Sequence, residues 1–227
     1  AVTTTDSKVG LLKHRLERMT VSLVTILGND DAANRQKLLT LLYFQQRPAL
    51  QSCDVESIAE AVLQIAQWGL ALGTEAHIVP RKGKAVAQKD YKGEIKLAIR
   101  DGRIRAYRHK TVGEFDEFEV LEGLSPNIVH KPNWKKPGAS IGAYAIVTLP
   151  DGSTDFEVLN REQIEEVRKR SASASNGPWV TDWDEMAKKT VGRRLLKRHI
   201  GDVQDADDVG GDPAPKPVTA LRAADPY

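Results

Sequence analysis

The stretch DYKGEIKLAIRDGRIRAYR, residues 90–108, carries the strongest local fold signal in the sequence. From Ile95 to Arg100 apolar and charged side chains alternate, which is typical of a half-buried β-strand. Asp101-Gly102 follows, and Asp-Gly between two alternating runs favours a type I′ turn because both central residues of that turn need a positive φ. The pattern therefore predicts a β-hairpin with one apolar and one cationic face.

The outer face of this predicted hairpin is crowded with positive charge. It carries Lys96, Arg100, Arg103, Arg105 and Tyr107. A two-residue loop would set Arg100 opposite Arg103, and like charges directly across a sheet repel each other. Lysines and arginines with an aromatic ring among them suit a nucleic-acid backbone, because the cations release counterions and the ring can stack on a base. A solvated basic strand with acidic neighbours is the alternative.

The composition is that of a globular chain whose charge is uneven rather than extreme. Its 227 residues are 41% hydrophobic and 28% charged, with a formal net charge of +2 at pH 7. This length allows one domain with tails or two small ones. Cys53 is the sole cysteine, which is typical of a reducing compartment. No apolar run approaches the roughly 20 residues of a membrane span, so we expect a cytoplasmic protein.

The domain organisation follows from changes in pattern along the chain. Residues 1–10 are small and polar and are expected to be disordered. Apolar residues at helical spacing predict a helical lobe within residues 11–70, with helices at 12–27, 32–44 and 54–69. An α+β core is expected from 71 to 200. Asp and Pro dominate residues 201–227, which predicts a disordered acidic tail.

The core is expected to be α+β, with antiparallel hairpins backed by helices. A strand at 77–80 precedes a basic loop. The acidic residues around 115–122 suit a strand edge, or a partner for the basic face on a neighbouring subunit. Alternation over 141–149 and again over 156–159, around Asp151-Gly152, predicts a second hairpin. Asn160 with Gln163 forms a capping-box pattern that opens a short helix.

A second basic segment is the loop from His130 to Gly138. It contains prolines, three lysines and Trp134. Proline interrupts regular structure, so this segment is expected to be a loop and a second candidate contact with a polyanion.

The last predicted helix begins after Asp182 and carries another concentration of cations. Ala187, Val191 and Leu195 line one side. Other positions bear Lys188, Lys189, Arg193, Arg194, Lys197 and Arg198. Like charges four residues apart weaken an isolated helix, which again points to an anionic ligand. A merely solvated helix face is the alternative.

No convergent catalytic constellation is evident in the sequence. Asp90, Glu94 and Lys96 resemble the acid followed by Glu-x-Lys of magnesium-dependent nucleases, but four residues leave no room for the separate strand that normally supplies the first acid. The five histidines lack metal-ligand spacing, and there is no Walker-type glycine loop. We expect no enzyme activity, metal site or cofactor.

A series of short motifs runs through residues 35–200. They include Pro48-Ala49-Leu50, Ala66-Gln67-Trp68-Gly69-Leu70, Tyr91-Lys92-Gly93, Phe115-Asp116-x-Phe118, Ile128-x-His130-x-Pro132, Gly142-Ala143-Tyr144-Ala145, Pro178-Trp179 and Met186-x-Lys188-Lys189-Thr190-Val191. In this order they resemble the RecT family of phage and prophage single-strand annealing recombinases.

This resemblance implies an ATP-independent protein of the bacterial host cytoplasm. Such a protein binds single-stranded DNA in a basic groove, pairs it with a complementary strand and holds the new duplex in an oligomeric ring or helical filament. The resemblance also suggests two further partners, a phage exonuclease and a host single-strand-binding protein. A monomeric single-strand-binding accessory module of replication is the alternative.

Carried onto this sequence, the family's DNA contacts fall on the two basic segments found above. The candidate DNA-binding residues are Lys89, Tyr91, Lys92, Lys96, Arg100, Arg103, Arg105, Lys188, Lys189, Arg193, Arg194 and Lys197.

Overall fold

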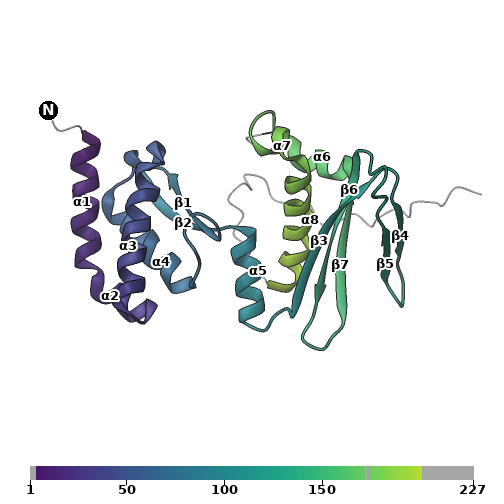
Figure 1. The fold of residues 1–227 in the computed structure, drawn as a ribbon, viewed down its shortest axis with the longest axis horizontal. Helices are drawn as coiled ribbons and strands as arrows, with labels where there is room; N and C mark the ends of the chain where they lie inside the picture. Colours follow the sequence, from purple (N-terminus) through teal and green to yellow (C-terminus); the bar gives the residue numbers. More distant parts are fainter. Residues whose placement is uncertain (1–3, 172–173, 201–227) are drawn as a thin grey trace, which may run out of the picture.

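The computed structural model of the protein describes residues 4–171 and 174–200, and it confirms the α+β class (Figure 1). An N-terminal lobe and a mixed core lie side by side, with α5 (Tyr91–Arg100) between them. The predicted acidic tail, 201–227, lies outside the described residues. Within the described part of the chain, no helix is both long and apolar enough to cross a membrane.

Four helices form most of the lobe: α1 (Thr4–Arg18), α2 (Thr20–Leu27), α3 (Asp30–Gln45) and α4 (Val55–Trp68). The second and third predicted helices are confirmed as α3 and α4. The predicted single helix at 12–27 is wrong, because the chain breaks at Met19 into α1 and α2. The expected disorder of residues 1–10 is also wrong for residues 4–10, which are helical and include the start of the apolar stripe of α1.

A short hairpin completes the lobe. The predicted strand at 77–80 is confirmed as β1 (Ala76–Arg81), but the basic loop expected after it is instead β2 (Lys84–Lys89). Lys82 and Gly83 both have positive φ, at 49° and 80°, as a type I′ turn requires. Apolar residues of both strands are buried in the same cluster as α1, α3 and α4.

The predicted hairpin over residues 95–107 is wrong, because its first strand is the helix α5. Asp90 caps the helix, its carboxylate accepting a hydrogen bond from the Lys92 N–H at 3.2 Å. At the other end Gly102 has φ +69°. The N–H groups of Gly102 and Arg103 donate to the carbonyls of Ile99 and Ala98, which is the Schellman pattern of helix termination.

Packing follows the helical period rather than the strand period. Leu97 and Ala98 are buried, whereas Ile99 is 45% exposed. Gly93 lets the helix approach the lobe closely, since a Cβ there would lie 2.2 Å from the Glu75 carbonyl oxygen. The helix therefore removes the expected cross-strand pairing of Arg100 with Arg103.

The core is built on an antiparallel sheet in the order β3 (Ala106–Gly113), β6 (Ser140–Thr148), β7 (Thr154–Asn160). The predicted hairpin at 141–159 is confirmed as β6 and β7. The last predicted helix is confirmed as α8 (Trp183–Ile200), which packs against one face of the sheet. Ala143, Ala145 and Val147 of β6 meet Val191 and Leu195 of α8 in this interface.

A two-stranded ribbon, β4 (Glu117–Leu121) with β5 (Asn127–Lys131), lies at the end of the core away from the lobe (Figure 1). It is attached by a chain of buried polar groups. Asp116 accepts a hydrogen bond from His130 Nε2 at 2.9 Å, and His130 Nδ1 lies 3.1 Å from the Tyr144 hydroxyl. The Phe118 ring stacks on Tyr144 with centroids 5.6 Å apart. The acidic strand edge predicted from the sequence is β4.

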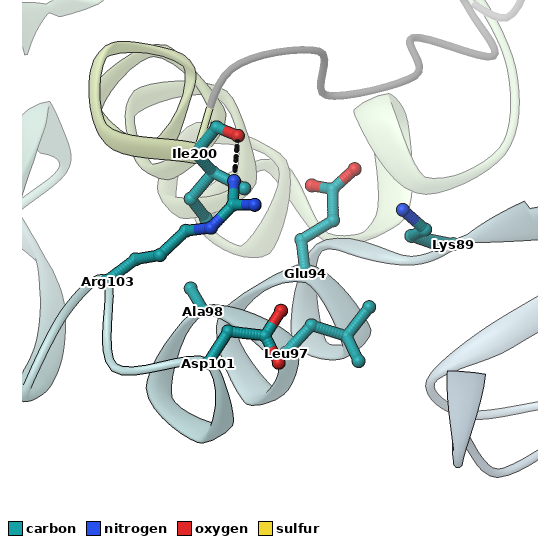
Figure 2. A pocket seen from close by; sticks show the side chains of 7 residues that line it. All are labelled: Lys89, Glu94, Leu97, Ala98, Asp101, Arg103 and Ile200. Atoms are coloured by element: carbon teal, nitrogen blue, oxygen red, sulfur yellow. Dashed lines mark hydrogen bonds between the residues drawn. The ribbon is translucent and has the colours of Figure 1, made fainter. Parts of the chain in front are cut away.

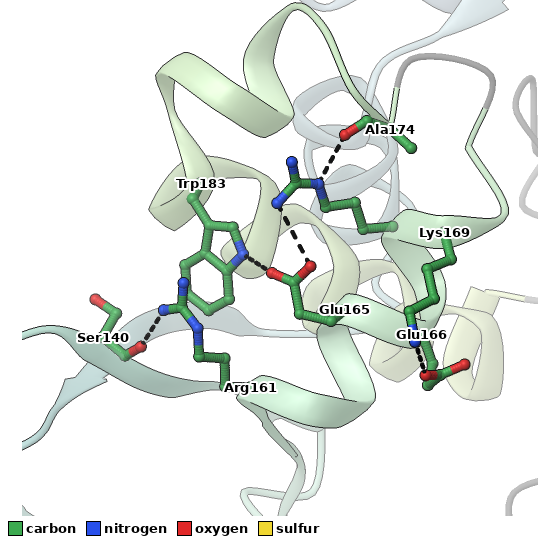
Figure 3. A network of polar contacts seen from close by, with 8 residues as sticks. Ser140, Arg161, Glu165, Glu166, Lys169, Ala174 and Trp183 are labelled. Atoms are coloured by element: carbon green, nitrogen blue, oxygen red, sulfur yellow. Dashed lines mark hydrogen bonds and ion pairs between the residues drawn. The ribbon is translucent and has the colours of Figure 1, made fainter.

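The N-terminal end of α8 is held by a polar network on α6 (Arg161–Lys169), whose capping box at Asn160 and Gln163 is confirmed. Trp183 Nε1 donates to Glu165 at 2.7 Å, and the Arg161 guanidinium lies over the Trp183 ring, 4.4 Å from its centroid (Figure 3). Arg168 donates to the carbonyl of Ala174, ahead of α7 (Pro178–Thr181). These contacts fix where α8 begins, and so where its first basic residues lie.

Candidate nucleic-acid interface

Three elements bring candidate residues together: the N-terminal turn of α5, strand β3 and the N-terminal half of α8. In the β3–β6 register Tyr107 pairs with Val147 and His109 with Ala145. Since Val147 and Ala145 belong to the face that packs on α8, Tyr107 and His109 point to the same face. The strand thus directs two rings toward the helices.

Tyr91, Tyr107 and His109 form one aromatic group, here called the Tyr–His cluster. The His109 ring lies 5.3 Å from Tyr107 in an edge-to-face arrangement and 6.0 Å from Tyr91. The Tyr107 hydroxyl is 3.2 Å from His109 Nδ1. Rings from a helix and from a strand therefore share one site that spacing along the chain does not reveal.

Gly192 of α8 allows Tyr107 to occupy this position. A Cβ at Gly192 would lie 2.0 Å from the Tyr107 hydroxyl oxygen. Burial raises the pKa of Tyr107 well above its ordinary value, with a further contribution from Tyr91. Tyr107 is therefore a neutral, fixed wall of the cluster rather than a mobile side chain.

Cations surround the Tyr–His cluster. Burial lowers the pKa of His109, and Lys188, Lys110 and Lys92 lower it further, while Glu185 opposes them. Lys92 is exposed and its ammonium lies 6.0 Å from the Tyr91 ring centroid, whereas Lys110 is exposed on the opposite face of β3 from His109. Positive charge beside partly exposed rings is the pattern that a sugar-phosphate chain with stacked bases requires.

The two lysines of α8 at this end have acidic neighbours. Lys188 pairs with Glu185 one turn earlier, and Lys189 Nζ lies 4.0 Å from Asp90 Oδ2. His77 of β1 lies 4.0 Å from the same Asp90 oxygen, so this carboxylate lies between β1 and α8 as well as capping α5. Burial is the main cause of the lowered pKa of His77.

Three of the predicted DNA-binding residues are directed elsewhere. Lys96 donates to Glu75 at 2.7 Å, Arg100 donates to the carbonyl of Trp68 at 2.8 Å, and Arg103 donates to the carbonyl of Ile200. All three side chains are outside the Tyr–His cluster. Cations on carbonyls at a helix C-terminus are favourable because those groups carry partial negative charge.

The remaining predicted cations are spread over α8 and its surroundings. Arg194 lies 3.9 Å from Glu157 of β7. Arg193 and Lys197 are half-buried, and Arg193 Nε is buried without a hydrogen-bond partner among the described residues. Arg105 is exposed at the entry to β3, and Lys89 lies over the Trp68 ring, 5.0 Å from its centroid.

A pocket of about 240 Å³ opens between α5 and the C-terminal end of α8 (Figure 2). It is lined by Lys89, Glu94, Leu97, Ala98, Asp101, Arg103 and Ile200. Figure 2 shows the Arg103 guanidinium at the Ile200 carbonyl. The mixture of acids and bases makes this pocket less suited to a polyanion than the Tyr–His cluster.

The residues of the nuclease alternative do not converge. Asp90 caps α5, Glu94 is 3% exposed and lines the pocket, and Lys96 pairs with Glu75. Across residues 4–171 and 174–200, no group of three or more His, Cys, Asp or Glu side chains could hold a metal ion.

Sequence reasoning missed the β3 part of the site. The sequence places Tyr107 on a predicted cationic face but not among the candidate DNA-binding residues, and His109 is one of five histidines without metal-ligand spacing. The alternation of Tyr107, His109 and Thr111 on β3 is a usable signal, because alternate residues of a strand share a face.

Comparisons with known proteins agree with the motifs. The family model described as the RecT family matches residues 33–219. Protein RecT of Escherichia coli (strain K12) is 38% identical over 190 residues, covering 79% of this chain and 71% of that protein. The uncharacterized protein YqaK of Bacillus subtilis (strain 168) is 29% identical over 176 residues, covering 76% of this chain and 61% of that protein. The chain belongs to the RecT family, and with it to the recombination proteins that anneal single strands.

Proposed function

We infer that this protein binds single-stranded DNA along the surface formed by α5, β3 and α8, and anneals it to a complementary strand without ATP. The Tyr–His cluster with Lys92 and Lys188 beside it is the observation that carries this assignment. Rings offer stacking surfaces that accept any base, and cations offer affinity that does not depend on sequence. Both are needed by a protein that leaves the reading of sequence to base pairing.

The role of the protein in annealing is to reduce repulsion and to hold strands in place. Cations along α8 and at the ends of β3 neutralise phosphates, so two strands approach at lower electrostatic cost. Copies assembled in a ring or filament would add many weak contacts along one strand. No covalent bond is made or broken, so no catalytic residue is required.

Not all candidate residues have equal roles in this proposal. Tyr91, Lys92, Lys188 and Lys189 belong to the primary contact, together with His109. Lys96, Arg100 and Arg103 already donate within the protein, and they are assigned to holding α5 in place. Lys89, Arg105, Arg193, Arg194 and Lys197 would extend the contact along the helix and strand ends.

The test is a double variant, Tyr91→Ala with Lys92→Ala, in a single-strand binding and annealing assay at low salt. We expect weaker binding by roughly tenfold or more, since base stacking alone contributes about 1–3 kcal/mol. The control is Lys169→Ala, which removes an exposed lysine paired with Glu166 on α6. Equal binding by the double variant and the control would refute the assignment of the site.

A monomeric single-strand-binding module remains the competing function. It is distinguished by measuring molecular mass with light scattering, first alone and then after adding complementary oligonucleotides in turn. A phage exonuclease and a host single-strand-binding protein remain candidate partners, and co-purification with either protein tests them.

A further inference from the structure

A second aromatic site lies at the other end of the core, in the loop between β5 and β6. Trp134 in this loop is 85% exposed. Figure 1 places the neighbouring β4–β5 ribbon on the side of the sheet away from α5. Phe118 and His130 of the ribbon contact Tyr144, which alternates with Ala143 and Ala145 and so points away from α8. The ribbon that precedes the loop is therefore on the other face of the sheet from the Tyr–His cluster, and the function proposed above does not use Trp134.

The loop that presents Trp134 is held on both sides of the ring. The Asn133 N–H donates to Asp116 Oδ1 at 2.7 Å. The Asn133 side-chain oxygen accepts from the N–H groups of Lys135 and Lys136, at 3.2 and 3.1 Å. Asp116 is itself fixed by His130 and by the Gly113 N–H. Hydrogen bonds to these backbone groups also lower the pKa of Asp116, so it stays ionised in this role.

Packing contacts with Phe115 hold the C-terminal side of the loop. The ammonium of Lys136 lies 3.7 Å from the centroid of the Phe115 ring. Gly138 has φ +68°, and a Cβ there would lie 2.8 Å from that same ring. The exposure of Trp134 is thus a property of a defined loop, and little backbone entropy would be lost when the ring binds a ligand.

The charges near Trp134 favour an anionic ligand with flat apolar groups. Lys135 and Lys136 follow the ring directly, and Lys131 precedes it in an exposed pair with Glu117. Glu114, whose Cβ lies near Gly138, and Asp116, which accepts from the Asn133 N–H, are the other acids close to the loop. The acids balance the lysines in number, but Asp116 is buried beneath the loop and Glu117 is paired with Lys131, so the charges next to the indole are those of the exposed Lys135 and Lys136. Two exposed cations directly after an open indole fit a base on a sugar-phosphate chain better than an apolar protein surface.

We propose that Trp134 stacks on an unpaired base of single-stranded DNA, as a second contact outside the α5–β3–α8 surface. This inference rests on the proposed function. A chain of single-stranded DNA that engages both sites would be held at two places on the core. The additional contact would favour a strand with unpaired bases over a duplex, whose bases are stacked on each other.

The test uses the full chain and the variants Trp134→Ala and Trp134→Phe. Subtracting the emission of Trp134→Ala from that of the wild type isolates the signal of Trp134 from the other three tryptophans. We expect an oligothymidylate to quench this signal, and an abasic oligomer of equal length to leave it unchanged. Trp134→Ala should bind the oligothymidylate roughly five- to a hundredfold more weakly, and Trp134→Phe should retain most of the affinity.

Leu124→Ala is the matched control. Leu124 is fully exposed between β4 and β5 and lacks lysine neighbours, so its removal should not change binding. An unchanged Trp134 signal while a labelled oligothymidylate binds would refute this inference and leave the proposed function standing. Quenching of the Trp134 signal by the abasic oligomer would refute the inference in favour of a phosphate contact. A change in the Trp134 signal with protein concentration alone would refute it in favour of a protein contact. Failure of the wild type to bind the oligonucleotide would refute both proposals.

Discussion

The dipeptide Asp-Gly occurs twice in this chain and terminates a different element each time. At residues 101–102 it ends α5, and at 151–152 it lies in the loop between β6 and β7. Both glycines have positive φ, at 69° and 89°, so each fills a position that other residues enter only with strain. The dipeptide therefore marks where an element ends without specifying which element it ends.

The difference lies in the residues that precede each Asp-Gly. Residues 91–100 contain Lys, Glu, Leu, Ala and Arg, which favour helix, and Asp90 supplies a cap. Residues 141–148 contain Ile, Tyr, Val and Thr, which favour strands. Pro150 precedes the second Asp-Gly and has no N–H to donate across a two-residue turn, so the chain makes a longer loop in which the Leu149 N–H donates to the Ser153 carbonyl.

The largest effect that separates the helix from a strand is expected from two truncations in α5. On a strand Leu97 and Ile99 would share the core face, but in α5 only Leu97 is buried. Leu97→Ala should lower the free energy of unfolding by about 2–5 kcal/mol, and Ile99→Ala by less than about 0.5 kcal/mol. Urea denaturation measures both, and similar losses would favour the strand.

A smaller, matched effect is expected at the two glycines. Gly102→Ala and Gly152→Ala each force a Cβ into a left-handed backbone, at a cost of about 1–2 kcal/mol. Neither added Cβ would meet another atom within 4 Å, so strain alone sets the loss. Thermal unfolding should therefore show similar falls in melting temperature for the two variants. Asn at either position should lower the melting temperature less than Ala does. A neutral Gly102→Ala would contradict the helix termination described here.

The smallest effect concerns the histidines on either side of α5. His77 and His109 have pKa values below the ordinary 6.5 in the folded protein, mainly because both are partly buried. Below about pH 6.5 the unfolded chain binds more protons at these sites, so the free energy of unfolding falls as the pH falls. Between pH 7.5 and pH 5.5 the free energy of unfolding of His109→Gln should fall less than that of the wild type, as measured by urea denaturation. An equal fall in the variant and the wild type would show that His109 does not contribute to the pH dependence of stability.

Much of the fold could be read from local patterns. The helices α3 and α4, the β6–β7 hairpin and the capping box at Asn160 each depend on neighbouring residues, and each was predicted. The break at Met19 and strand β2 were missed because their outcome depends on packing between segments. Clustering of cations on α5 and α8 was also visible, although pattern alone did not tell that Arg100 and Arg103 would bind carbonyl groups.

The sequence by itself determined where several elements end, among them α5 and α4, which residues carry the charge, and the membership of the RecT family. These features depend on local backbone preferences and on residue identity. Only the tertiary structure decided that residues 91–100 form a helix, and that Tyr91, Tyr107 and His109 meet. The reason is physical: Leu97 and Ala98 can be buried against the lobe and α8 only at helical spacing, and rings from a helix and a strand come together only when both pack on α8.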